Sequence, residues 1–300
     1  MIDIAIVLML FTPLLPSGAS PMMLWGAHGH TIAARVAVRE LPQEMPAFFR
    51  DAEDQLAYLN PEPDRWRDRD ETRSDPAMNA VFSPEHWVHL DEVPAAAFQA
   101  EDRYDYRLAL DRAGLDEGAG MLPYRALELA QRLRSGFRRW REETDPAARR
   151  WIEQRIINDA GILGHYVTDG SNPHHTTKHH DGWVGENPHD FTPGPGFHGR
   201  FEGEFVGAHV TIDDLHATVT EPAVVVPSFR AAIREHLERA HARLTRLYEL
   251  DKAIPFGAET ASPEHKAFAL ERLAAGARML RDLWWTAWVT SVEDPANEKD

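Results

Sequence analysis

Histidine and carboxylate residues recur at helical spacing in two segments of the chain. His165 and Asp169 stand four residues apart, and His198 and Glu202 repeat that spacing, again with the histidine first. Residues at i and i+4 project from one face of a helix, so each pair offers two donors side by side. His175 lies between the two pairs and adds a further donor. Zinc takes three or four nitrogen and oxygen ligands, and these residues therefore predict a metal site.

The alternative for a single pair of this kind is an exposed ion pair on a helix surface. Two such pairs that bracket a histidine-rich loop favour metal binding instead. The same loop contains four more histidines, for which we expect solvated or supporting positions rather than metal contact: His174, His179, His180 and His189.

Composition limits the metal ligands to imidazole and carboxylate. The 300 residues include 16 histidines and no cysteine, which excludes disulfide scaffolds, thiolate zinc fingers, iron–sulfur centres and cysteine nucleophiles. The chain has 48 acidic and 32 basic side chains and a formal charge of −16, so a basic nucleic-acid-binding surface is not expected. A hydrophobic fraction of 43% allows a sizeable core.

Helices must position these donors, because apolar residues recur with helical periodicity along most of the chain. The periodic stretches are Ile32–Leu41, Leu122–Trp140, Ala147–Asp169, Pro227–Leu250 and Ser262–Val292. Alternation typical of strands is nearly absent, and Ala223–Val226 is the best short candidate. Leu59–Glu85 and Gly170–Phe197 are rich in turn-forming residues, and we expect both to be irregular. The sequence therefore predicts an all-α fold in one domain of roughly 275 residues.

Residues 1–24 are predicted to be a signal peptide. Ile4–Leu15 is an uninterrupted apolar run that has the length of a signal-peptide core and is too short to cross a membrane. The small residues Ser17 and Ala19 favour cleavage after Ala19, and the alternative is a buried N-terminal helix. We therefore expect a secreted or periplasmic protein without a transmembrane anchor in its mature form.

Three motifs together resemble a known superfamily. They are Trp25-Gly26-Ala27-His28-Gly29-His30, His165-x-x-x-Asp169-x-x-x-Pro173-x-His175 and His198-x-x-x-Glu202. In order and spacing they are similar to the trinuclear zinc enzymes, which comprise bacterial zinc-dependent phospholipases C and single-strand-specific zinc nucleases. The resemblance covers residues 25–300. It implies one mostly helical domain with up to three zinc ions at the bottom of a cleft.

The same resemblance implies a ligand set for each ion. The first zinc would take Asp64, His86, His165 and Asp169. Two nearby carboxylates are alternatives to Asp64, namely Asp68 and Asp70. The second zinc would take His175, His198 and Glu202.

The third zinc would take His30, Asp169 as a bridge, and the α-amine and carbonyl of Trp25. Binding through an amine requires Trp25 to be the mature N-terminus, whereas cleavage after Ala19 leaves Ser20–Leu24 in front of it. Either a second trimming exposes Trp25, or the third ion is weakly bound or absent. Without the resemblance, Trp25 would be interpreted as a core aromatic and His30 as a histidine at a helix start.

The activity implied by the resemblance is zinc-dependent hydrolysis of phosphodiester bonds by a metal-activated water, which Asp64 would orient or deprotonate. Glu202 and the lack of cysteine favour the phospholipase C type. The opening segment Trp25–His30 favours the alternative, a single-strand nuclease or nucleotidase. A non-catalytic secreted zinc-binding protein is a third possibility. The substrate would be a phospholipid head group, a nucleic acid or a nucleotide. We expect no stable complex with nucleic acid, and we expect the protein to be a monomer.

Overall fold

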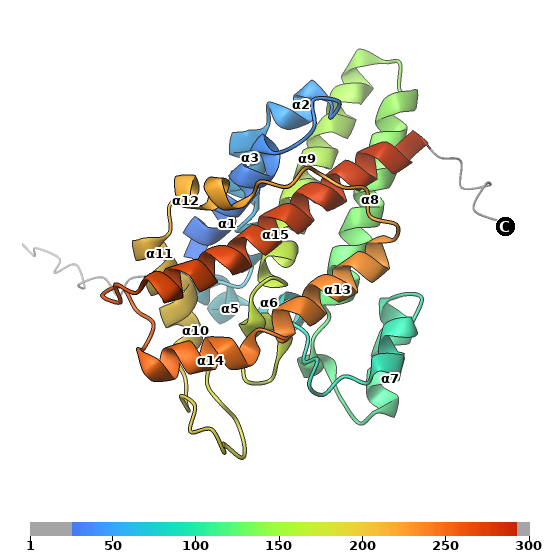
Figure 1. Ribbon diagram of the computed structural model, residues 1–300. Coiled ribbons are helices and arrows are strands. Elements are labelled where there is room, and N and C mark those ends of the chain that lie inside the picture. Colours follow the sequence, from blue (N-terminus) through green and yellow to red (C-terminus); the bar gives the residue numbers. More distant parts are fainter. Residues whose placement is uncertain (1–25, 293–300) are drawn as a thin grey trace, which may run out of the picture.

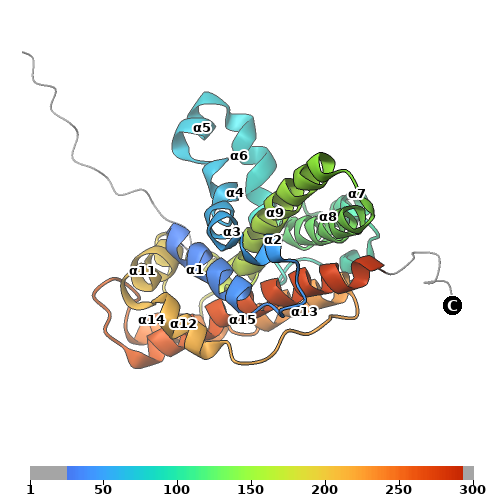
Figure 2. The ribbon, with the colours of Figure 1, turned by 90° about the horizontal axis from the view of Figure 1, so that it is seen from above.

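Long helices form the centre of the computed structural model, which describes residues 26–292 (Figure 1). The longest are α1 (Gly26–Arg39), α8 (Leu122–Glu142), α9 (Pro146–Asp169) and α15 (Pro263–Val289). α8 and α9 pack as antiparallel neighbours, and α15 packs against α1, α8 and α9 (Figures 1 and 2). Within residues 26–292 there is no strand, only two isolated β-bridges. The predicted all-α fold is confirmed.

Shorter helices surround this centre. They are α2 (Ala47–Arg50), α3 (Glu53–Leu59), α4 (Glu62–Arg65), α5 (Arg69–Ser74), α6 (Pro76–Phe82), α7 (Arg103–Arg112), α10 (Phe197–Gly199), α11 (Val206–His209), α12 (Ile212–Thr218), α13 (Phe229–His241) and α14 (Leu244–Ala253). Single turns complete the chain: the 3₁₀ turns η1 (Ser83–His86), η2 (Ala95–Gln99), η3 (Glu117–Ala119), η4 (Pro173–Thr176) and η6 (Thr290–Val292), and the π-helical turn η5 (Arg200–Phe205).

Helix α9 carries polar residues into the interior. It begins at a cap in which the Asp145 carboxylate accepts hydrogen bonds from two backbone N–H groups, with Pro146 at the first helical position. Its C-terminal half, residues 159–169, is buried on every face. A histidine and an aspartate at the end of such a helix are therefore held in a water-poor environment.

Two apolar clusters flank this helix end. One contains side chains of α8, α9 and the C-terminal half of α15, and the other contains side chains of η5, α14 and the N-terminal half of α15. α1 contributes to both, with Ile32 in one cluster and Val38 in the other. Donors from α1, α9 and α10 are thus fixed by packing on either side of them.

Glycines on α9 let α3 approach closely. A Cβ atom at Gly161 would lie 2.4 Å from Cβ of Leu59, and one at Gly164 would lie 2.5 Å from Nδ2 of Asn60. Real Cβ atoms do not approach neighbours this closely, so any larger residue would push α3 away. These glycines therefore place Asn60 beside the polar end of α9.

The long helices lie where the apolar periodicity predicts them, but the prediction for Leu59–Glu85 is wrong. Leu59–Glu85 is largely helical, in α4, α5, α6 and η1. α5 and α6 bury no residue, so they carry no apolar periodicity; the carboxylates of Asp68 and Asp75 cap them instead. In Figure 2 these short helices stand at one edge of the bundle.

Two further details concern the segment before α15. Pro227–Leu250 is two helices, α13 and α14, rather than one. Ala223–Val226 forms no strand. Backbone N–H groups of Val224 and Val226 donate instead to the side chains of Asp282 and Thr286 on α15, at 3.2 and 2.9 Å. Gly170–Phe197 is irregular as predicted, apart from η4.

The predicted signal peptide, residues 1–24, lies outside the described residues, as does Trp25. Among the helices of residues 26–292, none combines the length and the apolar character that crossing a bilayer requires.

Candidate metal centre

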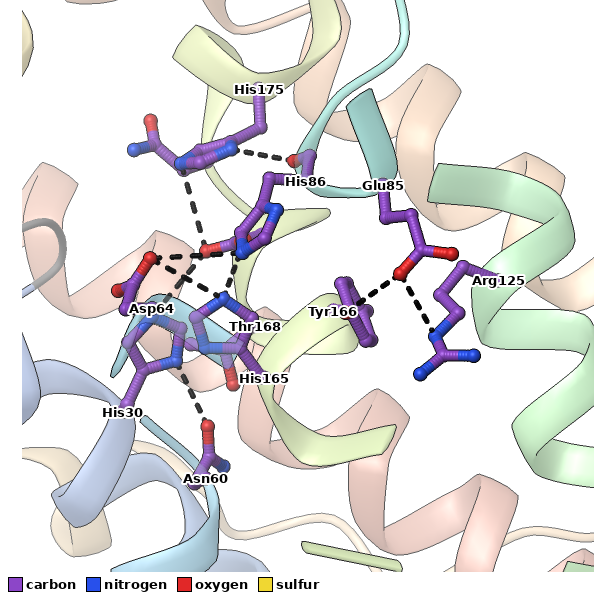
Figure 3. A network of polar contacts seen from close by, with 12 residues as sticks. His30, Asn60, Asp64, Glu85, His86, Arg125, His165, Tyr166, Thr168 and His175 are labelled. Carbon is purple, nitrogen blue, oxygen red and sulfur yellow. Dashed lines mark hydrogen bonds and ion pairs between the residues drawn. The ribbon is translucent and has the colours of Figure 1, made fainter. Parts of the chain in front are cut away.

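Eight of the predicted donors converge around the end of α9. Their ligand atoms form three groups, each within 4.8 Å: His30, His165 and Asp169; Asp64, His86 and His165; and His175, His198 and Glu202. Figure 3 shows five of these side chains pointing toward one another from α1, α4, η1, α9 and η4. Residues distant in the sequence are thus brought together as the sequence analysis expects.

Asp169 connects the groups. Its Oδ2 lies 3.2 Å from Nε2 of His165, one helical turn earlier on α9. Its Oδ1 lies 3.4 Å from Nε2 of His30 on α1 and 3.6 Å from Nε2 of His175 on η4. One carboxylate therefore reaches three imidazoles that come from three different elements.

Asp64 rather than its neighbours faces this cluster. Its Oδ1 lies 3.7 Å from Nε2 of His86 and 3.9 Å from Nε2 of His165. Asp68 instead caps α5, and Asp70 pairs with Arg73. The structure thus separates the three carboxylates that the sequence left as alternatives.

Asp64 is also the donor nearest to solvent. Its side chain is 21% exposed, whereas those of His86 and His165 are 0% exposed. Solvent therefore reaches the cluster at Asp64, whereas His86 and His165 behind it are inaccessible to solvent.

His175, His198 and Glu202 form a compact group. Oε1 of Glu202 lies 3.1 Å from Nε2 of His175 and 2.9 Å from Nε2 of His198. His198 is on α10 and Glu202 is on the π-helical turn η5 that continues it, so their i and i+4 spacing still brings them together. The side-chain amide of Asn172 donates to the same oxygen of Glu202 and fixes its orientation.

The ring nitrogens show what the cluster can bind. Nδ1 of His30 lies 2.9 Å from Oδ1 of Asn60, Nδ1 of His86 lies 2.9 Å from the carbonyl of Phe82, and Nδ1 of His175 lies 2.7 Å from the carbonyl of His86. Each of these oxygens accepts, so Nδ1 carries a proton and Nε2 is the nitrogen left to bind a metal ion.

Several of the atoms that face the cluster are buried and have only other donors of the cluster as close polar neighbours. They are Nε2 of His30, His86, His165 and His198, and Oδ2 of Asp169. Five buried donor atoms that point together and have close polar neighbours only among themselves indicate a shared ligand. Imidazole and carboxylate donors suit zinc, and the cluster fits this ion.

Charge in the cluster is balanced between acids and imidazoles. Burial lowers the pKa of His175, but the charges of Asp169 and Glu202 outweigh burial and raise it to about 9. Burial raises the pKa of Glu202, but His198 and His175 outweigh burial and hold it below its ordinary value. The carboxylates thus keep neighbouring imidazoles protonated. A divalent cation that bound to the same nitrogens would displace these protons into solvent.

Arg67 is a residue of this region that spacing did not reveal. Its Nη2 lies 3.1 Å from Oδ1 of Asp64, and its Nη1 donates to Oγ of Ser83 at 3.3 Å. Its Nε is buried without a hydrogen-bond partner. The only signal in the sequence that could have pointed to Arg67 is its position three residues after Asp64.

The four loop histidines expected to be peripheral are in none of the three groups. His180 and His189 are exposed, as predicted. His174 is fully buried, which leaves a supporting rather than a solvated position for it; its ring packs 4.6 Å from that of Phe197. His179 is buried too and stacks on Trp183 at 4.0 Å between ring centroids.

Comparison with known proteins gives a likeness of fold. No family model and no curated protein matches the sequence. Among solved structures, the alpha toxin from Clostridium absonum matches with a TM-score of 0.50 and 12% identity, over 95% of this chain and 68% of that chain. The alpha toxin from an avian strain of Clostridium perfringens matches with a TM-score of 0.42 and 12% identity, over 91% and 66%. The first likeness shows a shared all-α fold.

Proposed function

We propose that this chain is a zinc-dependent phosphodiesterase of the trinuclear zinc type, secreted after loss of residues 1–24 and folded as one domain over residues 25–300. The observation that carries the proposal is the convergence of seven imidazole and carboxylate side chains with Asp169 at the end of α9, where their buried ligand atoms face one another. The order of these residues in the sequence and the all-α fold are consistent with it.

The three groups of donors would hold up to three zinc ions. Asp64, His86, His165 and Asp169 would hold one, and His175, His198 and Glu202 another. His30 and Asp169 would hold the third together with Trp25, provided that Trp25 is the mature N-terminus. Bound zinc supplies Lewis acidity, which lowers the pKa of a water toward 7 and offsets negative charge on a phosphoryl group.

Asp64 is the residue proposed to act on the attacking water. It is the donor that solvent reaches, and a carboxylate there can orient a water and accept its proton. The Arg67 guanidinium beside it brings a permanent positive charge to the same edge of the site. We assign to Arg67 the binding of a phosphoryl oxygen, because a guanidinium donates two hydrogen bonds in a geometry that suits phosphate.

The preferred substrate is a phospholipid head group, in a reaction of the phospholipase C type. Glu202 in place of an aspartate and the lack of cysteine support this choice. The sequence of the opening segment, residues 25–30, supports single-strand nuclease or nucleotidase activity as the alternative. A zinc-binding protein without catalysis would use the same donors.

Parallel assays separate these functions. The zinc-loaded protein is given phosphatidylcholine vesicles, single-stranded DNA and single-stranded RNA, and released phosphorylcholine or nucleotides are quantified. Faster turnover of phosphatidylcholine supports the preferred function, and faster cleavage of nucleic acid supports the alternative. Zinc binding without turnover of any substrate would leave the non-catalytic role. N-terminal sequencing of the exported protein establishes whether Trp25 is its first residue.

A further inference from the structure

A buried hydrogen bond joins the residues next to two of the histidine donors. Glu85 immediately precedes His86 on η1, and Tyr166 immediately follows His165 on α9. The Tyr166 hydroxyl donates to Oε2 of Glu85 at 3.2 Å (Figure 3). Both side chains are buried, with exposed fractions of 6% for Glu85 and 0% for Tyr166. The bond therefore ties η1 to α9 directly behind the two imidazoles.

Glu85 is held in turn by arginines of two further helices. Its Oε1 lies 3.3 Å from Nη1 of Arg103, the first residue of α7, and its Oε2 lies 3.3 Å from Nε of Arg125 on α8. Arg103 also pairs with Glu128 of α8 at 2.6 Å. A buried carboxylate is costly unless it is paired, and these contacts fix its position from several sides.

The Tyr166 ring lies between this ionic network and the metal donors. Its centroid is 5.4 Å from that of His86 and 5.4 Å from that of His165, with edge-to-face geometry toward both. The Arg125 guanidinium carbon lies 5.4 Å from the same ring on the network side. Movement of Tyr166 would therefore disturb both imidazoles at once.

We propose that Tyr166 and Glu85 are positioning residues that set the distance between His86 and His165, and through it the geometry of the group Asp64, His86 and His165. The rings of His86 and His165 contact each other and both lie near Asp64, but the side-chain hydrogen bonds described for these histidines do not join η1 to α9. Nδ1 of His86 is bonded within its own segment, to Phe82, and the His86 carbonyl accepts from His175 of η4 rather than from α9. This inference rests on the proposed zinc site. Partners that orient metal-binding histidines change metal affinity by about 10- to 100-fold.

Tyr166→Phe tests the inference, since it keeps the ring and removes the hydroxyl. The matched control is Tyr106→Phe: Tyr106 is also 0% exposed and donates its hydroxyl at 3.2 Å, but to the backbone carbonyl of Gly120. Zinc retained per chain is measured in competition with a chelator, and the cobalt-substituted proteins are compared by visible absorption. We expect Tyr166→Phe to hold one ion about 10- to 100-fold more weakly and to alter the cobalt spectrum, while Tyr106→Phe does neither.

A second pair of variants keeps the test valid if Tyr166→Phe does not fold. Glu85→Gln weakens the hydrogen bond from Tyr166 to Glu85. Glu128→Gln is its control, because Glu128 also pairs with Arg103 but, in the interactions described, contacts neither Tyr166 nor a histidine donor. Glu85→Gln is expected to weaken zinc retention and Glu128→Gln to preserve it.

The outcomes separate this inference from the proposed function. Wild-type zinc affinity and cobalt spectra in both Tyr166→Phe and Glu85→Gln would overturn the positioning role, even if both variants were less stable. If the wild-type protein itself retains no zinc, the proposed metal site fails instead.

Discussion

The carboxylate of Asp169 lies 3.4 Å from Nε2 of His30, although the two residues belong to α9 and α1, on different sides of the site. Asp169 is buried, and its own helix already supplies His165 at 3.2 Å. A carboxylate shared between imidazoles of separate helices suits a residue that bridges two ions. Asp169 is therefore the donor whose loss should affect more than one ion.

Asp169→Asn is expected to lower the number of zinc ions per chain by more than one and to reduce phosphodiester turnover by at least about 100-fold. Residues that only orient a metal ligand already change metal affinity by up to about 100-fold, so loss of a ligand should have at least that effect. Metal analysis after dialysis and a turnover assay measure the two effects. Asp159→Asn is the control, because Asp159 is buried on the same helix but pairs with Arg132. Loss of zinc in the control as well would show that the effect is general to α9.

Removal of metal should abolish activity and lower the unfolding temperature, and added zinc should restore both. The physical reason is that ligands which bind only the folded state stabilise it, by about 4 kcal/mol when free zinc exceeds the dissociation constant 1,000-fold. Turnover and thermal unfolding are followed in excess chelator and after zinc is returned. Full activity in excess chelator would contradict the metal mechanism.

The metal-free protein should lose stability as the pH rises from about 6.5 to 9. Burial lowers the pKa of His175, but Asp169 and Glu202 raise it to about 9, and Asp169 also raises that of His30 against burial. A histidine with a raised folded-state pKa stabilises fully below the unfolded pKa of about 6.5, and this contribution disappears as the pH passes the folded pKa. The loss at His175 is on the order of 3 kcal/mol.

Urea unfolding of the metal-free protein at several pH values measures this trend. His236 serves as an internal control by NMR, because burial lowers its pKa to about 4 and its ring stays neutral throughout that range. Constant or increasing stability between pH 6.5 and 9 would contradict the protonation pattern of the cluster.

Arg67→Gln should reduce turnover by about 100-fold while zinc content stays unchanged, because removal of one donor to a transition-state oxygen has an effect of that size. Arg65→Gln is the control: Arg65 lies two residues earlier, at the end of α4, but pairs with Glu62 and is 40% exposed. Steady-state kinetics and metal analysis are compared for the two variants. Equal activity of both variants would remove Arg67 from the proposed site.

Gly164→Ala should destabilise the fold by about 1–3 kcal/mol and weaken zinc retention. The added methyl group would meet Nδ2 of Asn60 at 2.5 Å and displace the side chain that orients His30. Gly207→Ala is the control, since a Cβ atom there meets open space. Denaturant unfolding and metal analysis measure both effects, and unchanged zinc retention in Gly164→Ala would argue that Asn60 does not orient His30.

Local spacing in the sequence was enough to identify His165 with Asp169 and His198 with Glu202, because the helical repeat alone brings residues at i and i+4 together. Apolar periodicity likewise predicted the long helices, whose buried faces leave a regular pattern. It did not predict α5 and α6, which bury no residue and therefore leave no such pattern.

Tertiary structure alone decided which distant residues meet. It selected Asp64 over Asp68 and Asp70, placed Asn60 against His30, and joined Tyr166 to Glu85. These contacts depend on how α3, η1 and α9 pack, including the close approach that Gly164 permits, and packing between elements has no fixed period along a chain. The sequence by itself therefore determined the two helical pairs, and the fold determined how the other candidate donors assemble with them around Asp169.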